Sequence, residues 1–139
     1  MPVFPSLEWF DAIRQLVNAD ARFRRLGSCD MQVGVQVDDV FVEVVFEAFE
    51  CTKVRTLSVT EAHTSCDFVL AMHGTQWRAM LDNIRAHHGA DARYTLNSLE
   101  LPKVLHVRET ADYSRRDKFY QYNQTLQFFF DAAARLDAA

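Results

Sequence analysis

The chain has 139 residues, 49% of them hydrophobic, and this length and composition are sufficient for one continuous apolar core. With 19 acidic residues against 15 basic ones the formal net charge is −4, so the chain lacks the positive field that attracts nucleic acid or anionic lipid headgroups. We therefore expect no nucleic-acid partner.

The cysteines are odd in number and far apart, which argues against a disulfide framework or a zinc knuckle: Cys29, Cys51 and Cys66. Reduced thiols of this kind favour a cytoplasmic location. The first residues lead directly into a charged, amphipathic segment, and no apolar run approaches the roughly 18 residues that cross a bilayer. We expect no signal peptide and no integral membrane contact. Without linker-like tracts or repeats, residues 1–139 are predicted to form a single domain.

The N-terminal segment predicts two helices. Ser6 is a typical N-cap residue, and the apolar residues that follow recur on one helical face: Trp9, Ile13, Leu16 and Val17. The stretch Asn18-Ala19-Asp20 then offers a second cap, and Gly27 supplies a stop, so a short second helix follows the first.

Four further segments predict strands. Residues 31–37 alternate between apolar and polar side chains, the pair Asp38-Asp39 turns the chain, and residues 40–47 continue as a second, central strand. Residues 54–59 and 66–72 read as two more strands. Because no helical pattern separates these segments, an antiparallel meander is expected.

The remaining sequence predicts two long helices and a short strand between them. Thr75 is the expected cap of the first helix, which ends near His88 and Gly89. Alternation after Pro102 allows a strand in residues 103–108. Ser114 opens the last helix, whose apolar stripe is rich in aromatic residues: Phe119, Tyr122, Leu126, Phe129, Ala133 and Leu136. Such a helix packs over the sheet, lines a cavity or meets another subunit.

Three groups of residues, in this order along the chain, resemble the bacterial sterol carrier protein-like (SCP-2 sterol transfer) family: Glu8-Trp9-Phe10-Asp11-Ala12-Ile13 with Val17-Asn18-Ala19-Asp20 and Phe23; Cys66-Asp67-Phe68-Val69-Leu70; and Thr75 with Trp77 and Leu81. The resemblance covers most of the first 85 residues and thins beyond them, since residues 101–108 lack the family's usual Gly-Asp strand ending. It implies an α+β fold with a five-stranded, mainly antiparallel sheet flanked by helices. It also implies an apolar tunnel for fatty acyl, sterol or similar lipid ligands, and family members also occur as modules of larger enzymes.

A surplus of large apolar side chains supports the expectation of an internal pocket. Enclosing about 400 Å² of apolar ligand surface would yield roughly 10 kcal/mol before association costs, which permits micromolar binding. The alternative is that these side chains fill the interior or a dimer interface. Eleven residues are predicted to bind the ligand: Val44, Phe46, Phe68, Leu70, Trp77, Met80, Leu81, Tyr122, Leu126, Phe129 and Phe130.

Glu43 interrupts a strongly apolar strand. We expect it to face solvent; the alternatives are a pairing with a cation such as Arg55 or a position inside a cavity. A buried Glu43 would be the best general acid or base in the chain. It would then serve an alternative function, that of a small-pocket α+β barrel enzyme of the cyclase or isomerase type.

No metal, cofactor or catalytic residue is predicted. His87 and His88 are adjacent on a helix and point about 100° apart, and the pair Glu61 and His63, expected on one strand face, has no third ligand at a matching spacing. Nucleophile and phosphate-loop motifs are absent from the sequence. A third possibility is an accessory role, in which the C-terminal helix docks on a larger enzyme or forms a homodimer.

Overall fold

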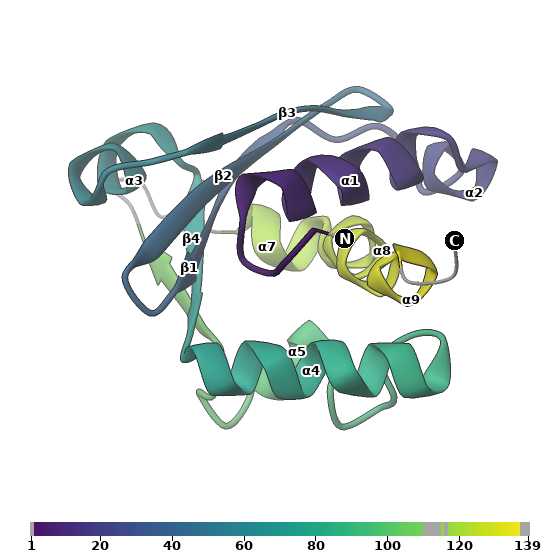
Figure 1. The fold of residues 1–139 in the computed structure, drawn as a ribbon. Coiled ribbons are helices and arrows are strands. Elements are labelled where there is room, and N and C mark those ends of the chain that lie inside the picture. Colours follow the sequence, from purple (N-terminus) through teal and green to yellow (C-terminus); the bar gives the residue numbers. More distant parts are fainter. Residues whose placement is uncertain (1, 110–114, 116, 137–139) are drawn as a thin grey trace.

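A five-stranded sheet forms the centre of the protein. The computed structural model describes residues 2–109, 115 and 117–136 (Figure 1). The strands lie in the order β3-β2-β1-β4-β5 across the sheet. Their bounds are β1 (Met31–Val37), β2 (Val40–Glu47), β3 (Glu50–Thr56), β4 (Phe68–Met72) and β5 (His106–Glu109). The strand predicted in residues 103–108 is thus present, shifted toward the C-terminus.

Three of the four strand pairings are antiparallel, and the fourth is parallel. The pairs β1·β2, β2·β3 and β4·β5 are antiparallel, whereas β4 lies parallel to β1 with Leu70 opposite Val35. The prediction of an antiparallel meander is therefore wrong at this step. A parallel neighbour needs a crossover connection, and the chain supplies one between β3 and β4. The sheet is mixed but mainly antiparallel, as the resemblance implies.

The crossover contains a helix, α3 (Val59–Ser65), where the sequence pattern predicts the end of a strand. A capping box starts this helix: the Glu61 backbone N–H donates to Ser58 Oγ at 3.2 Å, and the Ser58 N–H donates to Glu61 Oε1 at 3.1 Å. Glu61 and His63 consequently lie on a helix and not on a shared strand face. The strand predicted at 54–59 begins earlier, at Glu50, and ends before α3.

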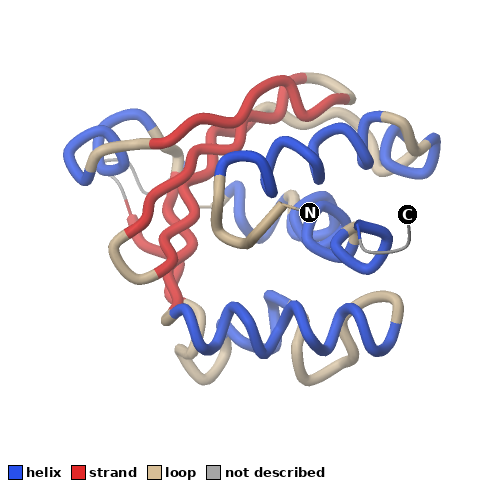
Figure 2. Tube along the Cα trace, viewed as in Figure 1, coloured by secondary structure: helices blue, strands red, loops and turns tan. Residues whose placement is uncertain are grey.

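Helices cover one face of the sheet. In Figures 1 and 2, α8 and α9 lie between α1 and α4. The bounds are α1 (Leu7–Asn18), α2 (Ala21–Arg24), α4 (Gly74–His87), α5 (Leu96–Glu100), α7 (Lys118–Gln121), α8 (Asn123–Asp131) and α9 (Ala133–Leu136). Ser6 caps α1 and Asp20 caps α2, as predicted.

Two predictions about helix ends are corrected by the structure. His73, and not Thr75, is the N-cap of α4, because Gly74 already has helical geometry and Asp38 accepts its backbone N–H at 2.9 Å. The final helix is not continuous: it breaks at Tyr122 and again at Ala132. The predicted start at Ser114 lies outside the described residues.

The alternation of side chains along the strands divides the apolar residues into two clusters. Odd-numbered residues of β1, such as Val33 and Val35, face the helices and belong to the main cluster. On the opposite face, α3 covers a smaller cluster formed by Phe41, Ala62, Cys66 and Val69. Gly34 lies in this second region, where a Cβ atom would come within 2.9 Å of Val69 Cγ2. The main cluster, between sheet and helices, is where the predicted ligand residues lie.

Candidate functional site

All eleven residues predicted to bind a ligand lie in or against the main apolar cluster. Ten of them are at most 2% exposed, and Tyr122 is partly buried against the cluster. They come from β2, β4, α4, α8 and the junction at Tyr122, and the first and last of them, Val44 and Phe130, are far apart in the sequence. The fold therefore brings together a set of residues that the sequence shows only as separate stripes.

Aromatic rings from three elements meet inside this cluster. Trp77 of α4 lies 5.3 Å from Phe130 of α8, measured between ring centroids. Phe129 packs edge to face against Phe46 of β2 at 5.8 Å and against Phe130 at 5.3 Å. Phe46 also lines a hollow of about 210 Å³ near the start of β1. In this conformation the protein's own rings occupy the space between β2, α4 and α8.

The segment α7–α9, here called the C-terminal cover, closes the interior and is held to the sheet by a buried carboxylate. Asp67 is 5% exposed and accepts from the Gln32 backbone N–H and from Arg115 Nε, each at 2.8 Å, and from Lys118 Nζ at 3.3 Å. At its other end, Arg135 pairs with Asp20 at 3.2 Å. Charged contacts thus fix both ends of a cover whose middle is apolar.

Trp9 places a polar atom in the apolar interior. Its side chain is fully buried, and within the described residues its indole Nε1 has no hydrogen-bond partner. The ring of Phe4 packs edge to face against Trp9 at 4.9 Å and also lies 6.2 Å from Trp77. A buried donor without an acceptor costs free energy, so Trp9 is a candidate to contact an oxygen atom of a ligand. The helical pattern predicts that Trp9 is buried, but no sequence signal tells whether its N–H finds an acceptor.

Comparison with solved structures identifies the architecture. The structure described as "Crystal structure of sterol carrier protein 2" superposes with a TM-score of 0.72, covering 95% of this chain and 98% of that one at 15% identity. This chain has the sterol carrier protein 2 fold. No protein-family model matches the sequence, and no curated protein matches it either. The five-stranded sheet and its flanking helices implied by the resemblance are confirmed by this match.

Within the sterol carrier protein 2 fold, Glu43 lies on the face of the sheet that points away from the aromatic interior. It is 2% exposed, so the expectation that it faces solvent is wrong. Arg55 Nε donates to Glu43 Oε1 at 2.8 Å, and Ser65 Oγ donates to Oε2 at 3.2 Å. Glu43 is buried because β2 lies inside the sheet, between β3 and β1, and α3 covers this side. The charge of Glu43 is balanced by Arg55. This position separates Glu43 from the residues predicted to bind a ligand.

The three cysteines of this sterol carrier protein 2 fold are buried and free. Burial raises the pKa of Cys29 to about 11 and the pKa values of Cys51 and Cys66 to about 12. Their thiols therefore remain protonated at neutral pH and are poor nucleophiles and metal ligands. In the described ranges, no three His, Cys, Asp or Glu side chains are grouped to hold a metal ion. None of the helices in those ranges combines the length and apolarity that a bilayer crossing needs.

Proposed function

We propose that this chain binds an apolar small molecule, such as a fatty acyl chain, a sterol or a similar lipid, between the sheet and the C-terminal cover. The observation that supports this most directly is the structural match over 95% of the chain to a protein named as a sterol carrier. The eleven predicted residues supply a continuous apolar surface in the same interior. A cytoplasmic location is part of the proposal, because the three cysteines are unpaired.

Binding requires the C-terminal cover to move, because the interior is filled by rings in the structure as described. The cover is built from helices of 4, 9 and 4 residues, and helices this short depend on packing for their stability. The ligand would replace the contacts of Phe129 and Phe130 with Phe46 and Trp77. An apolar ligand burying about 400 Å² gains roughly 10 kcal/mol, which is enough to offset several kcal/mol of association and rearrangement cost.

Trp9 supplies the polar contact in this proposal. A ligand hydroxyl or carbonyl oxygen placed beside Nε1 would accept the hydrogen bond that the described residues leave unmade. Ligands that carry one oxygen on an apolar body, such as sterols and fatty alcohols, match this interior better than fully polar molecules. Phe4 and Phe10, whose rings flank Trp9 at 4.9 and 5.0 Å, would enclose that end of the ligand.

The test is displacement of a fluorescent fatty acid by unlabelled fatty acids, fatty alcohols and sterols, with native mass spectrometry of the gently purified protein alongside. We expect saturable displacement with micromolar affinity and a 1:1 complex in the mass spectrum. No saturable displacement by any of these ligands, together with no co-purifying or added ligand in the mass spectrum, would overturn the proposal.

A matched pair of variants locates the binding site. Phe130→Leu removes a ring that the ligand must displace, so we expect tighter binding by several-fold. Val59→Ala, on the outer helix α3 and 56% exposed, should leave affinity unchanged. Circular dichroism of both variants checks that the fold is retained. Equal effects of the two substitutions would place the ligand outside the interior.

A further inference from the structure

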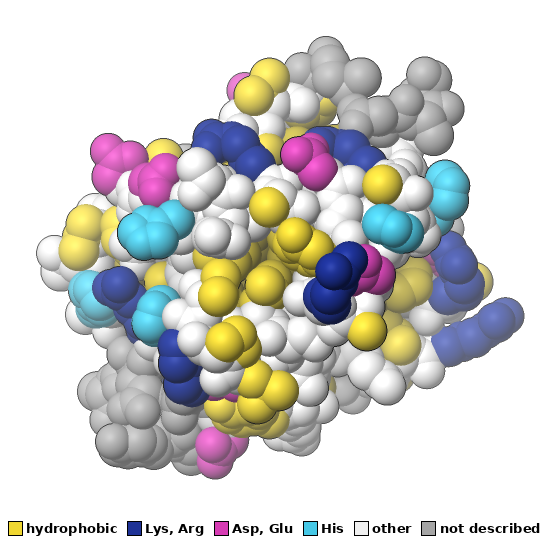
Figure 3. All heavy atoms as spheres, turned by 90° about the horizontal axis from the view of Figure 1, so that it is seen from below, with side chains coloured by type: hydrophobic (Ala, Val, Ile, Leu, Met, Phe, Trp, Pro, Cys, Tyr) yellow, Lys and Arg dark blue, Asp and Glu magenta, His cyan; other side chains and the backbone are white. Residues whose placement is uncertain are grey.

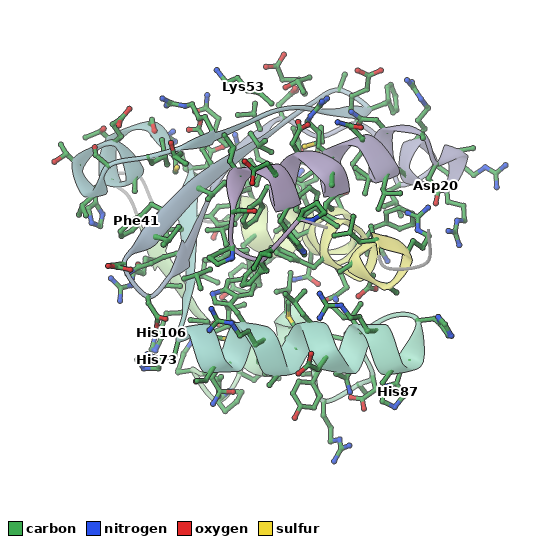
Figure 4. All side chains as sticks on the ribbon, viewed as in Figure 1. Asp20, Phe41, Lys53, His73, His87 and His106 are labelled. Carbon is green, nitrogen blue, oxygen red and sulfur yellow. The ribbon has the colours of Figure 1, made fainter. Side chains whose placement is uncertain are left out.

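A second hollow, separate from the apolar interior, lies where β4 ends and α4 begins. Its volume is about 450 Å³. Figure 4 shows His73 and His106 at this corner of the molecule, whereas His87 lies at the opposite end of α4. Residues from three stretches of the chain, 36–38, 71–76 and 103–108, build its wall. The residues that matter for its chemistry are Gln36, Asp38, His73, Lys103, His106 and Arg108. We refer to it as the histidine hollow.

Strand register explains why these side chains meet. His106 of β5 lies opposite Ala71 of β4, and Ala71 lies opposite Gln36 of β1, so the three side chains form one row. Arg108 is two residues further along β5 and projects from the same face. The neighbouring Val107 points into the interior, where it is 8% exposed. The histidine hollow is thus on the outer face of the sheet.

Cationic side chains outnumber the carboxylates that line this hollow. Arg108 has no ion-pair partner within residues 2–109, 115 and 117–136, while Lys103 Nζ contacts Glu100 Oε1 at 2.6 Å. The only carboxylate among the residues described as lining the hollow is that of Asp38. Its Oδ1 accepts the Gly74 N–H at 2.9 Å, at the positive end of α4. Figure 3 views the molecule from below and shows histidine side chains at both the left and the right of this face, with Lys and Arg side chains beside them.

Gln36 adds a hydrogen-bond acceptor, without a donor in the described ranges, to the wall of the histidine hollow. Its Nε2 donates to the Asp38 carbonyl oxygen at 3.1 Å, which sets the orientation of the amide. Its Oε1 is buried and accepts no hydrogen bond from any described residue. A ligand hydroxyl in the hollow would supply the missing donor after a small rotation of this amide.

We propose that the histidine hollow binds a phosphate ester that also carries a hydroxyl group, with the phosphate held by Arg108, Lys103 and the two histidines and the hydroxyl donating to Gln36. Arginine and lysine are the side chains that proteins use for phosphate, and an arginine without a carboxylate partner is free to make charge-assisted hydrogen bonds. The volume suits a small polar molecule of this kind. The proposal goes beyond lipid binding in the interior and does not depend on it.

Glycerol phosphate chemistry occurs both in soluble metabolites and in phospholipid headgroups, so the experiment has two arms. In the first arm, ¹H–¹⁵N and imidazole NMR signals are followed while inorganic phosphate or glycerol 3-phosphate is added to the whole chain. In the second arm, binding to phosphatidylglycerol vesicles is compared with binding to phosphatidylcholine vesicles. We expect saturation at about millimolar concentration or below in the first arm, with shifts centred on His73 and His106. If the protein binds phosphatidylglycerol vesicles but neither soluble phosphate compound, the hollow still recognises a phosphate ester, and the ligand is a phospholipid headgroup.

Matched variants decide whether the hollow is responsible. Arg108→Gln should weaken binding by about tenfold or more. Arg93→Gln should change nothing, because Arg93 is not among the residues that line the hollow. It is 85% exposed and pairs with Asp91 at 3.7 Å. Gln36→Met should weaken glycerol 3-phosphate but not inorganic phosphate. No saturable binding in either arm, or equal losses in the two arginine variants, would overturn the proposal.

Discussion

At the scale of single residues, Glu43 and Arg55 are unequal partners in one ion pair. Glu43 is 2% exposed and Arg55 is 39% exposed. Replacing Arg55 by Met leaves a buried carboxylate without its cation, which we expect to cost about 3 kcal/mol of unfolding free energy. Glu43→Gln leaves a guanidinium that already reaches water, so about 1 kcal/mol is expected. Urea unfolding at neutral pH measures both, and equal losses or a reversed order would contradict the assignment of Glu43 as the buried member.

Trp9 is the other residue whose environment makes a specific prediction. Trp9→Phe removes the unpartnered indole N–H while keeping an aromatic ring in the cluster. We expect the affinity for a sterol to fall about tenfold more than the affinity for the matching hydrocarbon that lacks the hydroxyl, because one hydrogen bond contributes about this factor. Displacement titrations with both ligands give the comparison. An equal loss for the two would mean that Trp9 contributes only volume.

At the scale of elements, the C-terminal cover is the part expected to open. Asp67→Asn weakens the attachment of the C-terminal cover through Arg115 and Lys118. The alkylation rate of the Cys29 thiol measures how often the cover opens. Burial raises the pKa of Cys29 to about 11, although a hydrogen bond with Thr125 of α8 opposes this. We expect alkylation of Cys29 to become several-fold faster in Asp67→Asn, because opening the cover exposes this thiol.

Site-resolved mass spectrometry separates opening of the cover from general unfolding. Cys51, packed elsewhere in the main cluster, should keep its slow rate. Asp82→Asn is the matched control, since Asp82 is 78% exposed and pairs only within α4 in the interactions described, with Arg85 at 3.4 Å. Equal acceleration at Cys29 and Cys51 would indicate loss of the whole fold and would contradict a separate cover.

Local patterns predicted those elements that local chemistry determines. The caps at Ser6 and Asp20 and the turn at 38–39 follow from short-range hydrogen bonding, and all are present. Helix α3 was missed because Val59, Thr60 and Thr64 favour a strand, although the Ser58 to Glu61 spacing carried the capping-box signal. The parallel pairing of β4 with β1 depends on a long-range crossover. The alternation of apolar and polar residues along one strand does not indicate which strand pairs with it or in which direction.

At the scale of the whole molecule, the sequence predicted the fold and the membership of the apolar interior. It could not predict how the interior is packed, since Phe129 and Phe130 suit a ring-filled core and a cavity wall equally well by composition. The histidine hollow was missed for a related reason: His73, His106 and Gln36 lie on segments far apart in sequence, and only the strand register brings them together.

The most direct test of the account is a ¹³C-methyl NMR titration with a fatty acid, in which contacts between the ligand chain and protein methyl groups are measured as intermolecular nuclear Overhauser effects. Met80 and Leu126 report on the interior, and Leu101, 76% exposed, reports on the surface. We predict saturating shifts and Overhauser effects from Met80 and Leu126. Effects confined to exposed methyl groups such as those of Leu101, or no effects at all, would contradict binding in the interior.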